Sequence, residues 1–207
     1  MKPGCRPFQH RRMRLLRATI LPGLACSLSQ ILVAQQPSNF TRGHAESVLN
    51  VIFDKDIGIA DAKARKDPKP MKSKHIGSAY SGKLIVVIDS RSASASEIFA
   101  RVIQIEKRGT VVGDRSAGAV MRAVSYPHQH GLDTVIPYAV SVTDADVIMK
   151  DGKSLEKVGV VPDETVLPTA ADLAAKRDPV LARAAALAGV SLDPEKAGSL
   201  FPIEWRK

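Results

Sequence analysis

The sequence predicts an α/β fold in which neighbouring strands are joined by a crossover helix. Two short aliphatic runs, KLIVVIDS at 83–90 and TVVGD at 110–114, have the continuous apolar pattern of strands covered on both faces. Between them, residues 95–107 place apolar side chains on one helical stripe, and Gly109 is expected to end the helix. A strand, a helix and a strand in so short a span favour a right-handed crossover unit. The stripe expected to be buried consists of Ile98, Phe99, Val102 and Ile103.

The segments before this unit are expected to be one helix and one irregular connection. Residues 46–57 have a helical apolar spacing that ends near Asp54. The polar stretch at 60–83 contains two prolines and many lysines, so we expect an extended or looping connection with solvated lysines.

The segments after the unit are expected to be β-rich decoration followed by helices. Residues 133–156 contain two β-rich runs, with Asp151-Gly152 as a tight-turn signal. The extended stretch VGVVPDETV follows. Two helices are expected at 170–176 and 179–189, the second beginning with Asp178 as its cap and proline at its first position.

Composition limits the chain to one ordinary domain with appendages. Its 207 residues are enough for one sizeable core, and the net charge of +9 is concentrated in residues 1–34, which hold six Lys or Arg and no acid. The remaining 24 basic and 21 acidic residues nearly balance. Because aromatic residues are sparse and no basic cluster is interleaved with them, a nucleic-acid partner is not expected.

The N-terminal segment has the features of a secretory signal. From the internal Met13 it has a basic start, an apolar middle and small residues near its end, while Pro22 makes it a poor membrane span. Either Met1 or Met13 can be the true start. We therefore expect an exported protein, periplasmic or extracellular, with no membrane span after leader removal.

The expected division is a signal-like leader at 1–35 and a core at 36–207. Both cysteines, Cys5 and Cys26, lie in the leader, so a core without them has no thiol for a disulfide or a metal site. No metal or cofactor is expected. The stretch GLAC at 23–26 is similar to a lipoprotein box, but its glycine stands where that box has an aliphatic residue, so lipidation is the less favoured alternative.

The stretch SASASE at 92–97 has two interpretations. Ser94 and Glu97 stand in the S-x-x-E relation of a capping box, which satisfies backbone donors at a helix start. Alternatively, Ser94 lies exposed at a strand-to-helix turn near backbone amides and the positive end of the helix dipole, where a nucleophile is well placed. The small alanines beside it would let another chain approach closely.

The stretches at 82–120 and 151–166, which include SASASEIFA, VVGD, SAGAV and SLEKVGVVPD, resemble the tail-specific (C-terminal processing) protease family, the S41 serine peptidases. The resemblance covers roughly residues 45–170. It implies the crotonase/Clp-like α/β core of that family, here with β-strand decoration and C-terminal helices. It also implies a polypeptide substrate, Ser94 as the nucleophile and the Ala95 amide as part of an oxyanion hole. Either Ser92 or Ser96 would then serve the helix start with Glu97.

The general base is the first departure from the family pattern. Processing proteases carry a lysine base in a G-K-G loop, and the matching stretch here is SAGAV, with Ala119 at the lysine position. Because a serine hydroxyl is a weak nucleophile without a base, another group must act or the chain is not a peptidase. Tricorn-like members also lack that lysine and use a histidine and a downstream glutamate. This likeness makes Glu156 a candidate; the alternative is a solvated hairpin carboxylate.

The second departure lies upstream of the serine. The family has a Gly-rich loop that completes the oxyanion hole, and usually a PDZ domain; this chain offers SNFTRGHAES, with Gly43 as a candidate remnant, and no apparent PDZ domain. This junction suggests a truncated or rearranged gene product. A non-catalytic remnant acting as a binding or interaction module is therefore the competing hypothesis, and the oligomeric state stays open.

The histidines offer further candidates. His44 and His75 could supply the missing base, but the sequence alone does not bring either to Ser94. His128 and His130 could face one way on a strand and bind a metal, although a pair without a third ligand is more typical of a surface loop.

If the protein is exported, its mature N-terminus should differ from the encoded one. We expect the leader to be removed at a site between Ala25 and Gln36, because an apolar run is followed there by polar sequence. Mass spectrometry of the expressed protein measures this terminus. An intact Met1 or Met13 on material found only in the cytoplasm would contradict the prediction.

Overall fold

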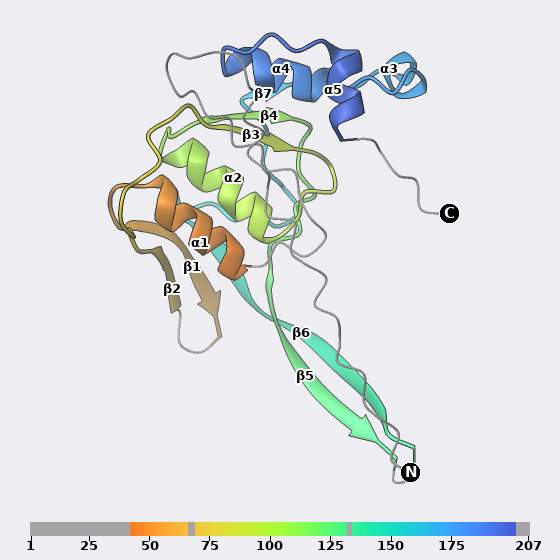
Figure 1. Cartoon of the computed structure of the whole chain (residues 1–207). Coiled ribbons are helices and arrows are strands. Elements are labelled where there is room, and N and C mark those ends of the chain that lie inside the picture. Colours follow the sequence, from red (N-terminus) through yellow and green to blue (C-terminus); the bar gives the residue numbers. More distant parts are fainter. Residues whose placement is uncertain (1–41, 66–68, 132–133, 202–207) are drawn as a thin grey trace, which may run out of the picture.

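The computed structural model describes residues 42–65, 69–131 and 134–201, and its centre is the predicted strand, helix and strand unit. Strand β3 (Ile85–Ile88) leads to helix α2 (Ala95–Ile105), which leads to strand β4 (Thr110–Gly113). Strands β3 and β4 pair in parallel, with Val86 opposite Val111. The predicted crossover unit is confirmed in its elements and their order (Figure 1).

Helix α2 ends earlier than expected, and not at a glycine. Its last turn is followed by Lys107, which adopts a left-handed φ of 51°. Gly109 serves a different purpose, since a Cβ atom there would come within 2.5 Å of the carbonyl oxygen of Leu84. The glycine thus permits the chain to enter β4 close to the backbone before β3.

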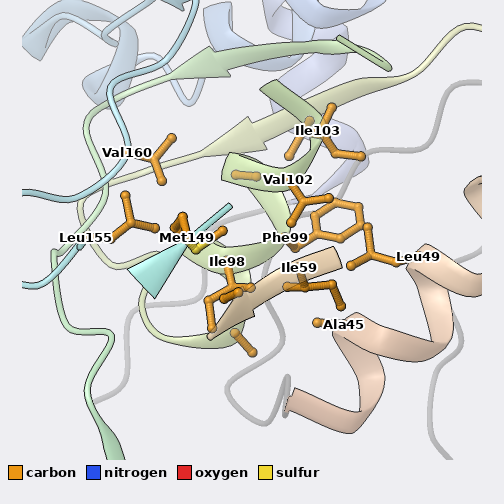
Figure 2. Packing of buried hydrophobic residues seen from close by; sticks show 14 of the residues in the cluster. Ala45, Leu49, Ile59, Ile98, Phe99, Val102, Ile103, Met149, Leu155 and Val160 are labelled. Carbon is orange, nitrogen blue, oxygen red and sulfur yellow. The ribbon is translucent and has the colours of Figure 1, made fainter. Parts of the chain in front are cut away.

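Both faces of β3 and β4 are covered, which explains their continuous apolar sequence. On one face, Val86 and Val111 pack with the four expected residues of α2, all of which are buried. Figure 2 shows Phe99 of α2 lying between Leu49 and Ile59, which come from other elements. On the other face, Ile85 and Val112 pack against alanines of a C-terminal helix.

The segment before β3 contains the expected helix, which begins and ends earlier than the predicted range of 46–57, and two strands that the sequence did not indicate. Helix α1 (Arg42–Ile52) is followed by strands β1 (Ile57–Ala64) and β2 (Lys69–Ser73), which pair antiparallel. The expectation of an irregular connection over 60–83 was therefore wrong for its first half. Small and charged residues hide the pattern, although Ile59, Ala60 and Ala62 of β1 are buried.

The downstream β-rich segment forms one long strand where two runs were expected. Strand β6 (Ile136–Met149) pairs with β1 at its carboxyl end and with β5 (Arg122–His130) along the rest, giving the sheet order β2-β1-β6-β5. Strand β5 was not expected. Beyond Met149 the chain turns at Asp151-Gly152, as predicted, and Ile148 bridges to Ser154.

The C-terminal part covers the second face of the parallel sheet. Strand β7 (Glu164–Thr165) adds to β4, and helices α3 (Ala170–Ala174), α4 (Pro179–Leu187) and α5 (Pro194–Leu200) follow. Figure 1 shows these helices on the side of β3 and β4 away from α2. The two expected helices are confirmed, with the Asp178 carboxylate capping α4 through the Leu181 amide at 2.8 Å. Helix α5 was not expected.

Two expectations about membranes and processing concern different parts of the chain. Within the described ranges, no helix has the length and apolar character needed to span a bilayer. The leader at 1–35, its cleavage site and its lipoprotein-like stretch lie outside the described residues.

Phe99 gives a direct test of this packing. Its ring is 2% exposed, so Phe99→Ala should lower the free energy of unfolding by roughly 3 to 5 kcal/mol through lost burial and a residual cavity. Urea denaturation followed by circular dichroism measures the change. Phe201→Ala is the matched control, because that ring is 51% exposed and its loss should have a small effect. Equal effects of the two substitutions would show that Phe99 is not part of the core.

Candidate active site

The candidate site lies where the loops after β3 and β4 meet. Parallel strands present their carboxyl ends at one edge, so these two loops emerge side by side, the usual place for a functional site in such sheets. The backbone joins them directly. The Ala117 amide donates to the Ser92 carbonyl at 2.9 Å, and the Ser94 amide donates to the Ala119 carbonyl at 2.9 Å.

Ser94 occupies a strained turn between β3 and α2. It is the N-cap residue of α2, with φ 57° and ψ −119°, a backbone conformation that residues other than glycine rarely adopt. The residue is exposed, while Ala95 and Ser96 beside it are buried. The Ala95 amide, at the first helical position, has no acceptor among the described residues. An exposed hydroxyl thus lies beside a free N–H at the positive end of a helix.

The turn is held by the carboxylate of Glu97, which is completely buried. Its Oε2 accepts hydrogen bonds from the amides of Ser94 at 2.9 Å and Ala119 at 3.0 Å. Its Oε1 accepts from the Ser116 hydroxyl at 2.6 Å and the Gly118 amide at 2.7 Å. One carboxylate therefore fastens both loops together, a role wider than the capping box that the sequence indicated.

A third segment, residues 155–160, packs on the same loop. The Ser116 hydroxyl accepts from the Val160 amide at 2.6 Å, and the Lys157 amide donates to the Gly118 carbonyl at 2.7 Å. Gly118 has φ 71°, and a Cβ atom there would lie 3.0 Å from the backbone of 157–159. Gly118 is thus needed for both its conformation and its close approach.

Glu156 lies in this third segment and reaches the end of the loop. Its Oε2 accepts from the amides of Val120 at 2.8 Å and Met121 at 3.2 Å, and the side chain is half-buried. It is therefore more than a solvated hairpin carboxylate. In the described part of the chain its Oε1 has no hydrogen-bond partner.

The structure brings Ser94, Ala95 and Glu156 to one edge, but does not supply an obvious base. Within the described ranges, no Lys, His, Asp or Glu side chain hydrogen-bonds to the Ser94 hydroxyl. Ala119 occupies the expected lysine position, with its backbone bonded to Ser94 and Glu97 and its side chain exposed.

The neighbouring serines differ from their expected roles. The N-cap is Ser94 itself, so the proposal that Ser92 or Ser96 would serve the helix start was wrong. The Ser92 hydroxyl instead accepts from the Asp89 amide at 3.0 Å and closes the turn after β3. The Ser96 hydroxyl is buried without a partner in the described structure.

The other candidate residues lie in different places. His75 is engaged elsewhere, since its Nδ1 lies 2.7 Å from the Phe53 carbonyl oxygen. Gly43 and His44 belong to α1, so Gly43 lies in a helix and not in a Gly-rich loop. His128 and His130 lie on strand β5, not in a loop, and the described residues contain no group of three potential metal ligands.

Sequence reasoning missed the bridging role of Glu97 and the contributions of Ser116 and Gly118. A signal was present, because a carboxylate at the third helical position is followed by the small residues of SAGA. Small side chains expose backbone amides, which are the donors that a buried carboxylate needs. The sequence could not show that the two stretches meet.

Fold and site together define an α/β protein with an exposed serine at a strand-to-helix turn, beside an amide that has no acceptor among the described residues. The family description Peptidase family S41 matches residues 43–166, more than half of the chain. The chain belongs to this family. The fold and family implied by the sequence resemblance are confirmed.

Two curated relatives and two solved structures show the extent of the similarity. A carboxy-terminal-processing protease of Bartonella bacilliformis is 33% identical over 40% of this chain and 18% of its own. Tricorn protease homolog 2 of Streptomyces coelicolor, whose assignment as a homologue is provisional, is 30% identical over 59% of this chain and 10% of its own. The chain therefore spans less than a fifth of the length of either relative.

The solved structures support the fold. A candidate peptidase from Parabacteroides merdae superimposes with a TM-score of 0.57 at 20% identity, covering 72% of this chain and 48% of that one. Mature CPAF complexed with lactacystin gives a TM-score of 0.51 at 16% identity, covering 62% of this chain and 37% of that one.

The bridging carboxylate can be tested by a nearly isosteric change. Glu97→Gln removes the charge and places an amide donor against two of the four donors, so we expect a loss of roughly 3 kcal/mol or more in the free energy of unfolding. Denaturant titration measures the loss. The control is Glu195→Gln at an exposed position of α5, for which the change should be small. Equal stability of both variants would show that the four bonds are not important.

Proposed function

We propose that this chain carries the nucleophilic part of a serine-type peptidase acting on polypeptides. Ser94 would attack the carbonyl carbon of a peptide bond, and the Ala95 amide would donate to the resulting oxyanion. The observation that carries the proposal is the exposed hydroxyl at a locked, positive-φ turn with the free Ala95 amide beside it. Membership in peptidase family S41 supports the reaction class.

A preorganised turn favours this chemistry. The Ser94 backbone is fixed by the Ala119 carbonyl and the Glu97 carboxylate, so neither the hydroxyl nor the neighbouring amide needs a large backbone rearrangement to meet a substrate. Fixed donors aimed at developing negative charge typically contribute about 2.7 to 4 kcal/mol each to transition-state stabilisation.

We assign Glu156 to the site as an assisting group. Its Oε2 holds the amides after Ala119, whose carbonyl in turn accepts from Ser94, and its Oε1 is available for a further bond. Glu156 lies in SLEKVGVVPD, the stretch that resembles the tricorn-like glutamate. A role of this carboxylate in orienting the proton acceptor is consistent with both features.

The competing proposal is a catalytically impaired member that binds polypeptides without cleaving them. It is favoured by alanine at position 119 and by the lack of an acidic or basic side chain on the Ser94 hydroxyl in the described ranges. Without a base the hydroxyl attacks slowly. Under either proposal we expect export, on the basis of the basic and apolar leader.

A serine-directed phosphonate probe distinguishes the two proposals. We expect slow labelling of the unmodified chain at Ser94, none in Ser94→Ala, and a modest increase in Ala119→Lys, where the new amine would lie next to the Ser94 turn and could accept the hydroxyl proton. Intact mass and the labelled peptide give the rate and the position. Ala117→Lys is the matched control, because it adds a lysine to an exposed position two residues away in the same loop.

Each outcome has a separate meaning. Brisk labelling of the unmodified chain would show that another base already serves Ser94, and unchanged labelling in Ser94→Ala would exclude Ser94. A lack of labelling together with saturable binding of an unstructured polypeptide would favour the impaired alternative. If Ala119→Lys and Ala117→Lys give equal rates, a lysine side chain at position 119 does not act on the Ser94 hydroxyl.

A further inference from the structure

The paired strands β5 and β6 project from the body as an isolated ribbon. We call this ribbon, residues 123–130 and 136–143, the arm; Figure 1 shows it extending away from the helices and from the rest of its own sheet. All of its residues are exposed. At its base the Arg122 guanidinium hydrogen-bonds to both oxygens of the Asp144 carboxylate, at 2.9 and 2.6 Å, which fixes where the arm leaves the body.

The two faces of the arm differ in chemistry. Antiparallel register places directly paired residues on the same face, and alternate pairs on opposite faces. One face, called the apolar face below, holds four pairs, and the other holds only small or polar residues and proline. The pairs of the apolar face are Val124 with Val142, Tyr126 with Val140, His128 with Tyr138, and His130 with Ile136.

The apolar face is large for a surface that no described residue covers. Six of its side chains are aliphatic or tyrosine and are 36% to 60% exposed, which together present on the order of 600 Å². The rings of His128 and Tyr138 stack with centroids 5.5 Å apart, so the middle of the face is aromatic. Because an isolated two-stranded ribbon is only marginally stable in water, an exposed face of this size indicates a packing partner.

The prolines at the edges of the arm favour a partner that packs on its face over one that pairs with an edge strand. Pro127 lies within β5 and Pro137 within β6, and sheets accept proline where the missing N–H would face an open edge. Such positions discourage the addition of a further strand. Stacking of a second sheet against the face needs no free backbone donor.

We propose that the apolar face packs against the same face of a second copy of this chain. The face carries no Lys, Arg, Asp or Glu, so two copies can stack without repulsion between acidic or basic side chains. A symmetric contact would bury roughly 1,200 Å² in total, which reaches the lower end of specific interfaces. In an antiparallel two-fold arrangement the aromatic rows at the centre meet each other, and the valines at the base meet Ile136 at the far end.

Sedimentation velocity of the full chain over a wide range of concentration tests this dimer. We expect the unmodified chain to dimerise reversibly, and Val140→Lys to weaken the dimer by about tenfold or more, since each interface then contains two buried lysines. The matched control is Ala139→Lys, one residue away on the same strand but on the opposite face, which should leave the dissociation constant unchanged. Circular dichroism and the thermal midpoint establish that both variants fold.

A cross-linking experiment identifies the contact without relying on a destabilising variant. A photoreactive phenylalanine analogue at Tyr138, in a mixture of isotopically labelled and unlabelled chains, should join the two copies through residues of the apolar face. Several results would overturn the proposal: a monomer at every concentration, a dimer equally affected by both lysines, or cross-links to the body of the second copy. So would a monomer that binds phospholipid vesicles through the same face.

Discussion

The buried carboxylate of Glu97 is the interaction on which the candidate site depends. It accepts four hydrogen bonds from two loops that are more than twenty residues apart at their centres, and the other described bonds between these loops are the two backbone bonds from Ser94 to Ala119 and from Ala117 to Ser92. Burying a charged group is costly unless it is well hydrogen-bonded. Here the donors are amides and one hydroxyl, and the carboxylate also lies in the first turn of α2, where the helix dipole favours negative charge.

Ala119 supports the site through its backbone and not through its side chain. Ala119 contributes its amide to Glu97 and its carbonyl to Ser94, while its side chain is exposed and contacts neither bond. The turn therefore accepts different side chains at position 119 without a change in the backbone.

The two ends of β6 differ in burial because different elements lie against them. At the carboxyl end every second residue is buried, namely Ala145, Val147 and Met149, because β1 pairs with this end and α2 packs on it. Between Ile136 and Thr143 the alternation of apolar and small residues continues, yet every residue is exposed, since only β5 accompanies the strand there. Alternation marks a face that is suitable for burial. Whether the face is covered depends on what lies against it.

The sequence alone determined the crossover unit, the two helices after it at 170–174 and 179–187, and the place of Ser94 at the start of α2. The aliphatic runs at β3 and β4, the stripe on α2 and the Asp178 cap of α4 follow from periodicity and capping, which act over a few residues, so they could be predicted. The resemblance of the SASASE stretch and its surroundings also sufficed to identify the family. By contrast, β1 and β2 were missed because their burial comes from sheet pairing, β1 with β6 and β2 with β1, and from packing against α1, and not from a strong apolar pattern of their own. The tertiary structure alone decided that Glu97 binds the loop at 116–119 and that Glu156 holds the amides beyond it. These contacts join residues far apart in sequence, and no local property of either stretch specifies which donor meets which acceptor.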